Sequence, residues 1–309
     1  MPQFAMENII PDLVFDTPRI CKLTDKEFIK NNVEVSILRL DEIHPVISGN
    51  KLFKLYYFLK EAKNFPSKKV ITFGGAYSNH LAATAFAFKK SNLECIGIVR
   101  GEKPKVLSPT LLFCIENGMK IRFLSRQNYR EINEKYFLEK LAKEYGEPTL
   151  IPEGGFSLNG AEGAALITKF YQGNYTHICL AVGTATTFAG IINGIKNDSQ
   201  IMGFSVLKNM NDIDKRLEEL QVASGKNYSF IPDYHFGGYA KKTDELISFM
   251  NDFYAQHNIP LDFVYTGKMM FGVYDLIRKN YFPSGARILC IHTGGLQGNN
   301  SLKKGTLIF

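Results

Sequence analysis

The feature that most constrains this chain is a regular alternation between short apolar runs and longer amphipathic stretches. The apolar runs have the length of strands, and they are Val70–Phe73, Cys95–Val99, Ile121–Leu124, His177–Val182, Ile201–Val206 and Ile288–His292. Between them lie predicted helices at Leu55–Phe65, His80–Lys90, Tyr129–Tyr145, Thr187–Lys196, Asp212–Leu220, Asp244–His257 and Met269–Asn280. Strands that are apolar at nearly every position are typical of parallel sheets covered on both faces. The pattern therefore predicts an α/β fold, with helices on both sides of parallel sheets.

The stretch from about Asn50 to Pro152 contains several of these strand–helix units, enough for a sheet of its own. One helix in it is bounded by strong signals, with Ser108 as its N-cap, Pro109 at its first position and Gly118 just past its end. We therefore expect a smaller domain of residues 51–154, inserted into a larger domain built from residues 1–50 and 155–309.

Composition argues against several classes of protein. The net charge of +7 comes with lysines scattered along helices, so we expect a solvated surface and no nucleic-acid partner. The five cysteines form no CxxC pair, and Cys95, Cys179 and Cys290 lie in apolar runs, which indicates reduced cysteines in a cytoplasmic protein. Residues 1–13 lack the pattern of a signal peptide, and no apolar run reaches the length of a membrane span. The six histidines are dispersed without an HxxxH or HExxH pattern, so no metal site is expected.

Reactive and small residues gather at four places where strands end or helices begin, which is the edge where α/β folds bind ligands. In the first, SGNKLFK at 48–54, Lys51 and Lys54 stand three apart and share a helix face. They are either two solvated lysines or, because a helix N-terminus disfavours cations and apolar residues flank them, desolvated amines. A desolvated lysine has a depressed pKa and serves as a nucleophile or base.

The second segment, FGGAYSNH at 73–80, runs from a strand through two glycines into a helix. Its amides suit an anion, and Ser78, Asn79 and His80 suit a carboxylate or phenolate oxygen. The alternative is a glycine turn in which Ser78 or Asn79 caps the helix and His80 is structural.

The third segment, AVGTATTFAG at 181–190, is a buried strand followed by small and hydroxyl residues that open a helix, an arrangement that binds phosphate. It contains neither a dinucleotide fingerprint nor a P-loop. A tight turn without a ligand is the alternative.

The fourth segment, IHTGG at 291–295, ends the last strand and places the Thr293 hydroxyl where it can bond a neutral ring nitrogen. VYTGK at 264–268 reads as another strand end, and Tyr265 offers a phenol for acid–base chemistry. Each of the two segments alone is equally compatible with an ordinary turn.

Five of these motifs, GNKLFKL, GGAYSNH, GTATTFAG, VYTGK and IHTGG, occur in the order of a known family. From about Asp41 to Gly298 the chain resembles the 1-aminocyclopropane-1-carboxylate (ACC) deaminases and D-cysteine desulfhydrases. These are pyridoxal 5′-phosphate (PLP) enzymes of fold type II, related to the tryptophan synthase β chain. The resemblance implies two α/β domains with parallel or mixed sheets, PLP between them, and a homodimer.

The resemblance also implies roles for individual residues. Lys51 would carry PLP as a Schiff base and move the Cα proton, with Ser78 and Tyr265 as further catalytic residues and either Tyr265 or His80 moving the second proton. Ser78, Asn79 and His80 would bind the substrate. The remaining cofactor contacts would come from Lys54 and the phosphate loop, from Asn79 at the pyridoxal O3′ oxygen, and from Thr293 at the pyridine nitrogen. The loop residues are Gly183, Thr184, Ala185, Thr186 and Thr187.

Two positions bear on the substrate, a small amino acid. A threonine hydroxyl at Thr293 leaves the pyridine nitrogen largely neutral, which suits β-elimination of a good leaving group. Ser78-Asn79-His80 is the pattern of D-cysteine desulfhydrases, whereas ACC deaminases have Ser-Asn-Gln. We therefore expect conversion of D-cysteine to pyruvate, hydrogen sulfide and ammonia, with ACC deaminase activity as the alternative. A non-catalytic small-molecule binding protein is the alternative from another class.

Overall fold

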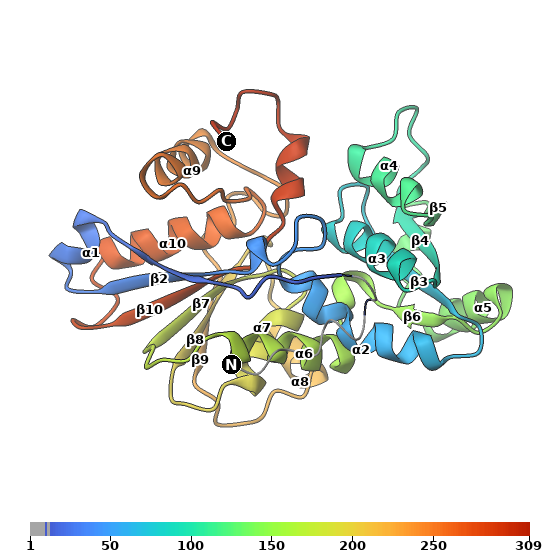
Figure 1. Cartoon of the computed structure of the whole chain (residues 1–309), viewed down its shortest axis with the longest axis horizontal. Helices are drawn as coiled ribbons and strands as arrows, with labels where there is room; N and C mark the ends of the chain where they lie inside the picture. The colour runs from blue at the N-terminus through green and yellow to red at the C-terminus, as the bar shows by residue number, and fades with distance from the viewer. Residues whose placement is uncertain (1–9, 11–12) are drawn as a thin grey trace.

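The computed structural model describes residue 10 and residues 13–309, and within them the strands form two sheets that lie side by side (Figure 1). The larger sheet has the order β1 (Ile20–Leu23), β2 (Glu34–Arg39), β10 (Arg287–His292), β7 (His177–Val182), β8 (Gln200–Ser205) and β9 (Tyr228–Ile231). The smaller sheet has the order β5 (Lys120–Leu124), β4 (Glu94–Arg100), β3 (Lys69–Gly74) and β6 (Thr149–Ile151). Paired strands are parallel throughout, except that β1 runs antiparallel to β2. The predicted α/β class is therefore confirmed, although the pattern did not indicate four of the ten described strands, β1, β2, β6 and β9.

Helices cover both faces of each sheet. In Figure 1, α9 (Asp244–His257) and α10 (Thr266–Arg278) lie on one side of the larger sheet, and α6 (Leu158–Ala165), α7 (Thr186–Gly194) and α8 (Ile213–Glu219) lie on the other. The short α1 (Lys26–Lys30) precedes β2. Around the smaller sheet are α2 (Asn50–Asn64), α3 (Asn79–Lys90), α4 (Pro109–Glu116) and α5 (Lys135–Tyr145).

Alternate residues of the central strands face opposite cores, which explains why these strands are apolar at nearly every position. On β7, Ile178 and Leu180 join the core beneath α2, α6 and α7, whereas Cys179 packs into the core beneath α9 and α10. On β3, Val70 faces the first of these cores and Ile71 faces a third core that Leu141 of α5 completes. A strand buried on both faces needs apolar side chains on both.

Small residues on α6 allow unusually close helix packing. A Cβ atom on Gly163 would lie 2.1 Å from the carbonyl oxygen of Phe53 on α2, and a Cβ on Gly190 of α7 would lie 2.4 Å from the carbonyl oxygen of Ala161. The backbone of α6 therefore touches both α2 and α7. Helix α6 sets the spacing between these two helices, and both begin at predicted functional motifs.

Three local predictions were wrong in detail. Helix α2 begins at Asn50 rather than Leu55, so Lys51 and Lys54 lie in its first turns. The stretch predicted as one helix at Tyr129–Tyr145 is a short 3₁₀ turn at Asn128–Glu131 followed by α5. VYTGK does not end a strand: Tyr265 is the N-cap of α10, because the side chain of Asp262 accepts hydrogen bonds from the first backbone amides of that helix.

The strands are distributed as the domain prediction requires, although the boundaries at residues 50 and 154 remain a prediction. The four strands of the smaller sheet lie between residues 69 and 151, and those of the larger sheet lie in 20–39 and 177–292. The predicted absence of a signal peptide rests mainly on residues 1–9, 11 and 12, which lie outside the described residues. Among the helices that are described, none is both long enough and apolar enough to cross a membrane.

Candidate active site

The predicted motifs meet at the carboxyl ends of four parallel strands. FGGAYSNH follows β3, the loop at 153–155 follows β6, GTATT follows β7 and TGG follows β10. Contacts between these loops, described below, bring segments more than 200 residues apart into one site. The carboxyl edge of the sheets is where α/β folds bind ligands, so the location fits the prediction.

The start of α2 rests directly on the end of β10. Gly49 adopts a left-handed φ of 72°, and a Cβ atom there would lie 2.1 Å from the carbonyl oxygen of Thr293. The Asn50 amide donates to the same oxygen over 3.2 Å. Only glycine fits this close approach and this backbone conformation. The contact fixes where Lys51 emerges from the helix.

Lys51 is partly buried, and its Nζ donates to the Asn50 Oδ1 over 2.7 Å. The same Nζ lies 5.6 Å from the centroid of the Tyr265 ring. Burial lowers the pKa of Lys51 from 10.5 to about 8, against an opposing effect of the Asp262 carboxylate. An amine with this pKa is half neutral near pH 8, as a nucleophile or base must be.

Lys54 lies one turn further along α2 and is 3% exposed. Its Nζ lies 3.5 Å from Thr184 Oγ1 in the predicted phosphate loop. Burial, with the neighbouring Lys51, lowers the pKa of Lys54 well below its ordinary value. A phosphate dianion at this place would favour the protonated form again. Lys54 and the loop are therefore placed to hold an anion between them.

The predicted phosphate loop has the conformation of an anion cradle. Ala185, which precedes the first residue of α7, has a left-handed φ of 68°, uncommon for a residue with a side chain. Such a turn followed by a helix N-terminus directs several backbone amides to one point. The Thr184 and Thr186 hydroxyls lie 2.9 Å apart, and Thr187 Oγ1 accepts from Asn50 Nδ2 over 2.7 Å. The last bond links the loop to the start of α2.

Ser78, Asn79 and His80 open α3 on the other side of the site. Ser78 does cap the helix, since its Oγ accepts from the Leu81 amide over 3.3 Å, but its own proton remains free to donate. Asn79 Nδ2 donates to the Gly295 carbonyl over 3.2 Å, which ties α3 to the end of β10. The oxygen of the Asn79 amide is buried and has no hydrogen-bond partner.

His80 is 3% exposed and has one defined tautomer. Its Nε2 lies 3.0 Å from Thr72 Oγ1, and that hydroxyl already donates its proton to the Ile151 carbonyl, so Nε2 must be the donor. The other ring nitrogen, Nδ1, is then an acceptor, and it is buried without a partner. Burial, together with Lys54 and Lys51, lowers the pKa of His80 well below 6.5, so the ring is neutral.

Tyr265 lies between Lys51 and the phosphate loop, because a Cβ atom on Gly183 would be 3.2 Å from its ring. The Asp262 Oδ1 accepts from the Tyr265 amide over 2.7 Å, and its Oδ2 accepts from the Thr266 amide and hydroxyl. Burial raises the pKa of Tyr265 well above 10, so the phenol keeps its proton at neutral pH. The structure therefore places a neutral acid next to a lysine that can act as a base.

Three residues of the site were not predicted. Asp262 is fully buried, Tyr239 has its hydroxyl 3.4 Å from that of Tyr265, and Gly155 would place a Cβ 3.5 Å from Lys54 and 3.7 Å from His80. Asp262 stands three residues before Tyr265, and a carboxylate at that spacing is a helix-capping signal that the sequence offered. Tyr239 and Gly155 lie in segments with no distinctive pattern, and only the fold brings them to the site.

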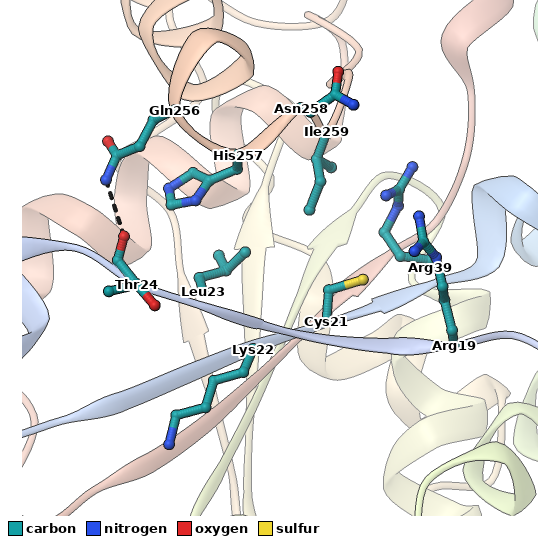
Figure 2. Close-up of a pocket in the computed structure, with 10 residues that line it drawn as sticks. All are labelled: Arg19, Cys21, Lys22, Leu23, Thr24, Arg39, Gln256, His257, Asn258 and Ile259. Carbon is teal, nitrogen blue, oxygen red and sulfur yellow. Dashed lines mark hydrogen bonds between the residues drawn. The ribbon is translucent and has the colours of Figure 1, made fainter.

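A cavity of about 400 Å³ lies away from this site, between β1 and the end of α9 (Figure 2). Residues 19, 21–24, 39 and 256–259 line it, and none of them belongs to the predicted motifs. The Arg39 guanidinium at its edge is already bonded to both oxygens of Asp41. The predicted chemistry therefore does not reside in this cavity.

The residues at the motif site fit PLP. The two buried atoms without partners, Asn79 Oδ1 and His80 Nδ1, cost free energy unless a ligand bonds them. Lys54 and the amides after Ala185 suit a phosphate, and Lys51 is the amine with a lowered pKa that a carbonyl cofactor requires. Thr293 lies at the end of β10 and is 5% exposed, in the segment predicted to meet the pyridine ring.

The fold and site thus define an α/β enzyme that binds PLP. In agreement, a family model described as pyridoxal-phosphate dependent enzyme matches residues 26–294, and the chain belongs to that family. Both the predicted cofactor and the predicted class of enzyme are confirmed.

Similar proteins within this family give a more specific comparison. The chain is 32% identical over 281 residues to a putative ACC deaminase of Pyrococcus horikoshii, which covers 86% of this chain and 85% of the relative. It is 30% identical over 305 residues to the bifunctional D-cysteine desulfhydrase/ACC deaminase of Arabidopsis thaliana, which covers 87% of this chain and 74% of the relative. The predicted resemblance is confirmed.

Solved structures give the same picture of the fold. The crystal structure of an ACC deaminase homologue superposes with a TM-score of 0.79 at 29% identity, over 97% of this chain and 96% of that one. A threonine deaminase of Solanum lycopersicum superposes with a TM-score of 0.65 at 16% identity, over 96% of this chain and 85% of that one, which shows the shared fold.

Proposed function

We propose that the protein catalyses β-elimination from a small amino acid, with D-cysteine as the preferred substrate and pyruvate, hydrogen sulfide and ammonia as products. The pairing of Lys51 with Tyr265 carries the proposal, because an amine with a pKa of about 8 lies 5.6 Å from the ring of a phenol that keeps its proton. Elimination needs a base at Cα and an acid at the leaving group. The name of the Arabidopsis relative includes this reaction.

In this proposal, Lys51 and Tyr265 carry out the two proton transfers. PLP, when bound to the substrate amine, withdraws electrons from Cα and so acidifies the Cα proton. The Lys51 Nζ removes that proton, the bond between Cβ and sulfur breaks, and the Tyr265 hydroxyl protonates the departing thiolate. His80 is neutral because its pKa is depressed, and its one N–H is directed to Thr72, so of the two candidates Tyr265 is assigned the second proton transfer.

Ser78, Asn79 and His80 orient the substrate. The Ser78 hydroxyl has a free proton for the substrate carboxylate, and Nδ1 of the His80 ring accepts a hydrogen bond from the substrate or cofactor. Lys54 and the loop from Gly183 to Thr187 hold the phosphate, and Thr293 meets the ring nitrogen. A hydroxyl there keeps that nitrogen largely neutral and favours substrates whose leaving group takes the charge away.

ACC deaminase activity is the second candidate, because the names of the Pyrococcus and Arabidopsis relatives and of the solved homologue include it. We also propose a cytoplasmic enzyme, since the five cysteines are free and Cys95, Cys114, Cys179 and Cys290 are buried. We further propose a homodimer, on the family resemblance, and a smaller domain of residues 51–154, which the distribution of the strands supports.

A visible absorbance spectrum, followed by separate additions of D-cysteine, L-cysteine and ACC, tests the proposal. Bound cofactor should give a visible band, and D-cysteine should release sulfide and keto acid in equal amounts. Lys51→Ala should lose both the band and turnover, whereas Lys60→Ala, an exposed lysine on the same helix, should keep both. Keto acid from ACC without sulfide from D-cysteine would replace the first candidate by the second.

A further inference from the structure

A segment between β9 and α9, residues 234–241, brings a second phenol to the site. The Tyr265 hydroxyl donates to the Tyr239 hydroxyl over 3.4 Å, and the two rings meet at 74° with centroids 6.0 Å apart. The Tyr265 ring centroid lies 5.6 Å from the Lys51 Nζ. The position of Tyr239 therefore determines the hydrogen bonding of the proposed acid.

The backbone of this segment is poorly suited to hold Tyr239 by itself. Left-handed φ values occur at Phe236 (51°), Gly237 (90°), Gly238 (116°) and Ala240 (53°). At the two non-glycine residues this conformation costs free energy, and it persists only where the surroundings impose it. The Tyr239 side chain is 45% exposed, so its own burial contributes little. The segment needs anchors outside itself.

Helix α10, which begins immediately after Tyr265, supplies these anchors. Lys268 extends its Nζ to the segment and donates to the carbonyl oxygens of His235 over 2.8 Å and of Gly238 over 2.7 Å. The two bonded carbonyls lie on either side of Phe236 and Gly237, two of the residues with left-handed φ values. The Gly238 carbonyl also accepts from the Lys241 amide over 3.1 Å. Through this shared carbonyl, Lys268 is connected to the backbone that follows Tyr239 as well as to the backbone that precedes it.

Two further anchors lie on the same face of α10, three and seven residues after Lys268. The Phe271 ring packs edge-on against Phe236 with centroids 4.9 Å apart. The Asp275 Oδ2 accepts from the Tyr234 hydroxyl over 2.7 Å. One face of one helix therefore holds the segment that carries Tyr239, while the start of the helix holds Tyr265.

Burial of the Lys268 ammonium costs free energy. Its side chain is 0% exposed, and no carboxylate in the described part of the chain pairs with its ammonium. Burial lowers its pKa from 10.5 to about 8, against the attraction of Asp262. An apolar side chain would fill the same volume without desolvating a charge, but it could not donate the two bonds to the His235 and Gly238 carbonyls.

We propose that Lys268 is a positioning residue for the reaction: its two bonds to main-chain carbonyls fix the 234–241 segment so that Tyr239 meets Tyr265. Lys268 touches neither substrate nor cofactor, and it acts through Tyr239. The inference rests on the proposed function for its effect on turnover, but the effect on the segment itself is independent of any reaction.

Lys268→Met tests the inference in the holoenzyme, with Met270→Leu as a matched control at another buried position of α10. Hydrogen exchange at the amides of Gly237, Gly238 and Lys241 should become at least about tenfold faster in Lys268→Met and stay unchanged in the control. Turnover should fall about 10- to 100-fold, because a displacement of about 1 Å at a reacting group has effects of this size. Cofactor absorbance should be retained.

A double-mutant cycle with Tyr239→Phe separates positioning from general destabilisation. If Lys268 acts through Tyr239, Lys268→Met should lower the turnover of the Tyr239→Phe enzyme by less than about threefold. An independent, multiplicative loss would overturn the inference, and so would unchanged exchange in Lys268→Met. Should that variant fail to fold, Lys268→Gln, whose shorter side chain loses at least one of the two bonds, takes its place, and unchanged exchange there would count equally against the inference. A wild type without turnover would refute the proposed function alone, since exchange still decides the role of Lys268.

Discussion

Replacing Gly163 by alanine should uncouple Lys51 and Lys54 from the predicted phosphate loop. Gly163 lies on the face of α6 that touches α2, where the added Cβ would be 2.1 Å from the carbonyl oxygen of Phe53. Relief to an ordinary contact distance of 3.4 Å requires a displacement of about 1.3 Å. The obstacle is main chain rather than a flexible side chain, so α2 itself must shift. Phe53 immediately precedes Lys54, so both lysines shift with it.

The size of the effect follows from two opposing contributions. Helix propensity alone predicts that alanine stabilises α6 by about 1 kcal/mol. Overpacking of a filled interior costs about 1–3 kcal/mol, and the backbone contact places this site at the upper end. The expected net change is a loss of about 2 kcal/mol in the free energy of unfolding. Turnover should fall about 100-fold, because the bond between Asn50 and Thr187 and the approach of Lys54 to Thr184 are lost.

Urea unfolding, cofactor absorbance and turnover with D-cysteine, the proposed substrate, measure the three consequences. Glu162→Ala is the matched control, since Glu162 is the exposed neighbour on the same helix and gains helix propensity without a new contact. If Gly163→Ala proves as stable and as active as Glu162→Ala, then α6 does not set the spacing between α2 and α7, and the argument from close packing fails.

Two other changes probe the electrostatics of the site. In cofactor-free protein, Lys51→Met should raise the free energy of unfolding at pH 7 by about 1–3 kcal/mol, because a folded pKa of about 8 against 10.5 penalises the charged lysine in the folded state. Since that penalty is relieved as pH rises from about 8 to 10.5, urea midpoints of the two proteins should converge over this interval, and a constant gap would contradict a lowered pKa. Thr293→Glu should lower sulfide release from D-cysteine at least about tenfold, since a carboxylate keeps the ring nitrogen protonated; unchanged release would refute the role of a neutral partner.

The sequence predicted what depends on local pattern. Uniformly apolar runs identified β3, β4, β5, β7, β8 and β10, and β7 begins and ends at the predicted residues. Strands β1, β2, β6 and β9 were not predicted, because they are short or carry polar residues among their apolar ones, as in ICKL of β1 and EVSILR of β2. The early start of α2 was not predicted, because lysines such as Lys51 and Lys54 are unfavourable at a helix N-terminus. The contact of Gly49 with Thr293, 244 positions away in the sequence, imposes this start.

The motif residues that meet at the site could be singled out because each lies at a strand end or a helix start with a distinctive composition. The residues that hold the motif residues in position could not be predicted. Asp262 and Lys268 act through hydrogen bonds to main-chain groups, and such bonds are available to many residues in many positions. Tyr239 has no local signal, since its role depends on the packing of its segment against α10. Buried polar networks of this kind are specified by the tertiary structure.

The contact between Gly49 and the end of β10 gives the two sides of the site one common reference. Lys51 is secured to that strand end through this contact, and to the predicted phosphate loop through the bond from Asn50 to Thr187. On the other side, the bond from Asn79 to Gly295 ties the start of α3 to the same turn. A substitution that shifts residues 293–295 should therefore displace Lys51 and Asn79 together, so one three-residue turn sets the distance between the two sides of the site.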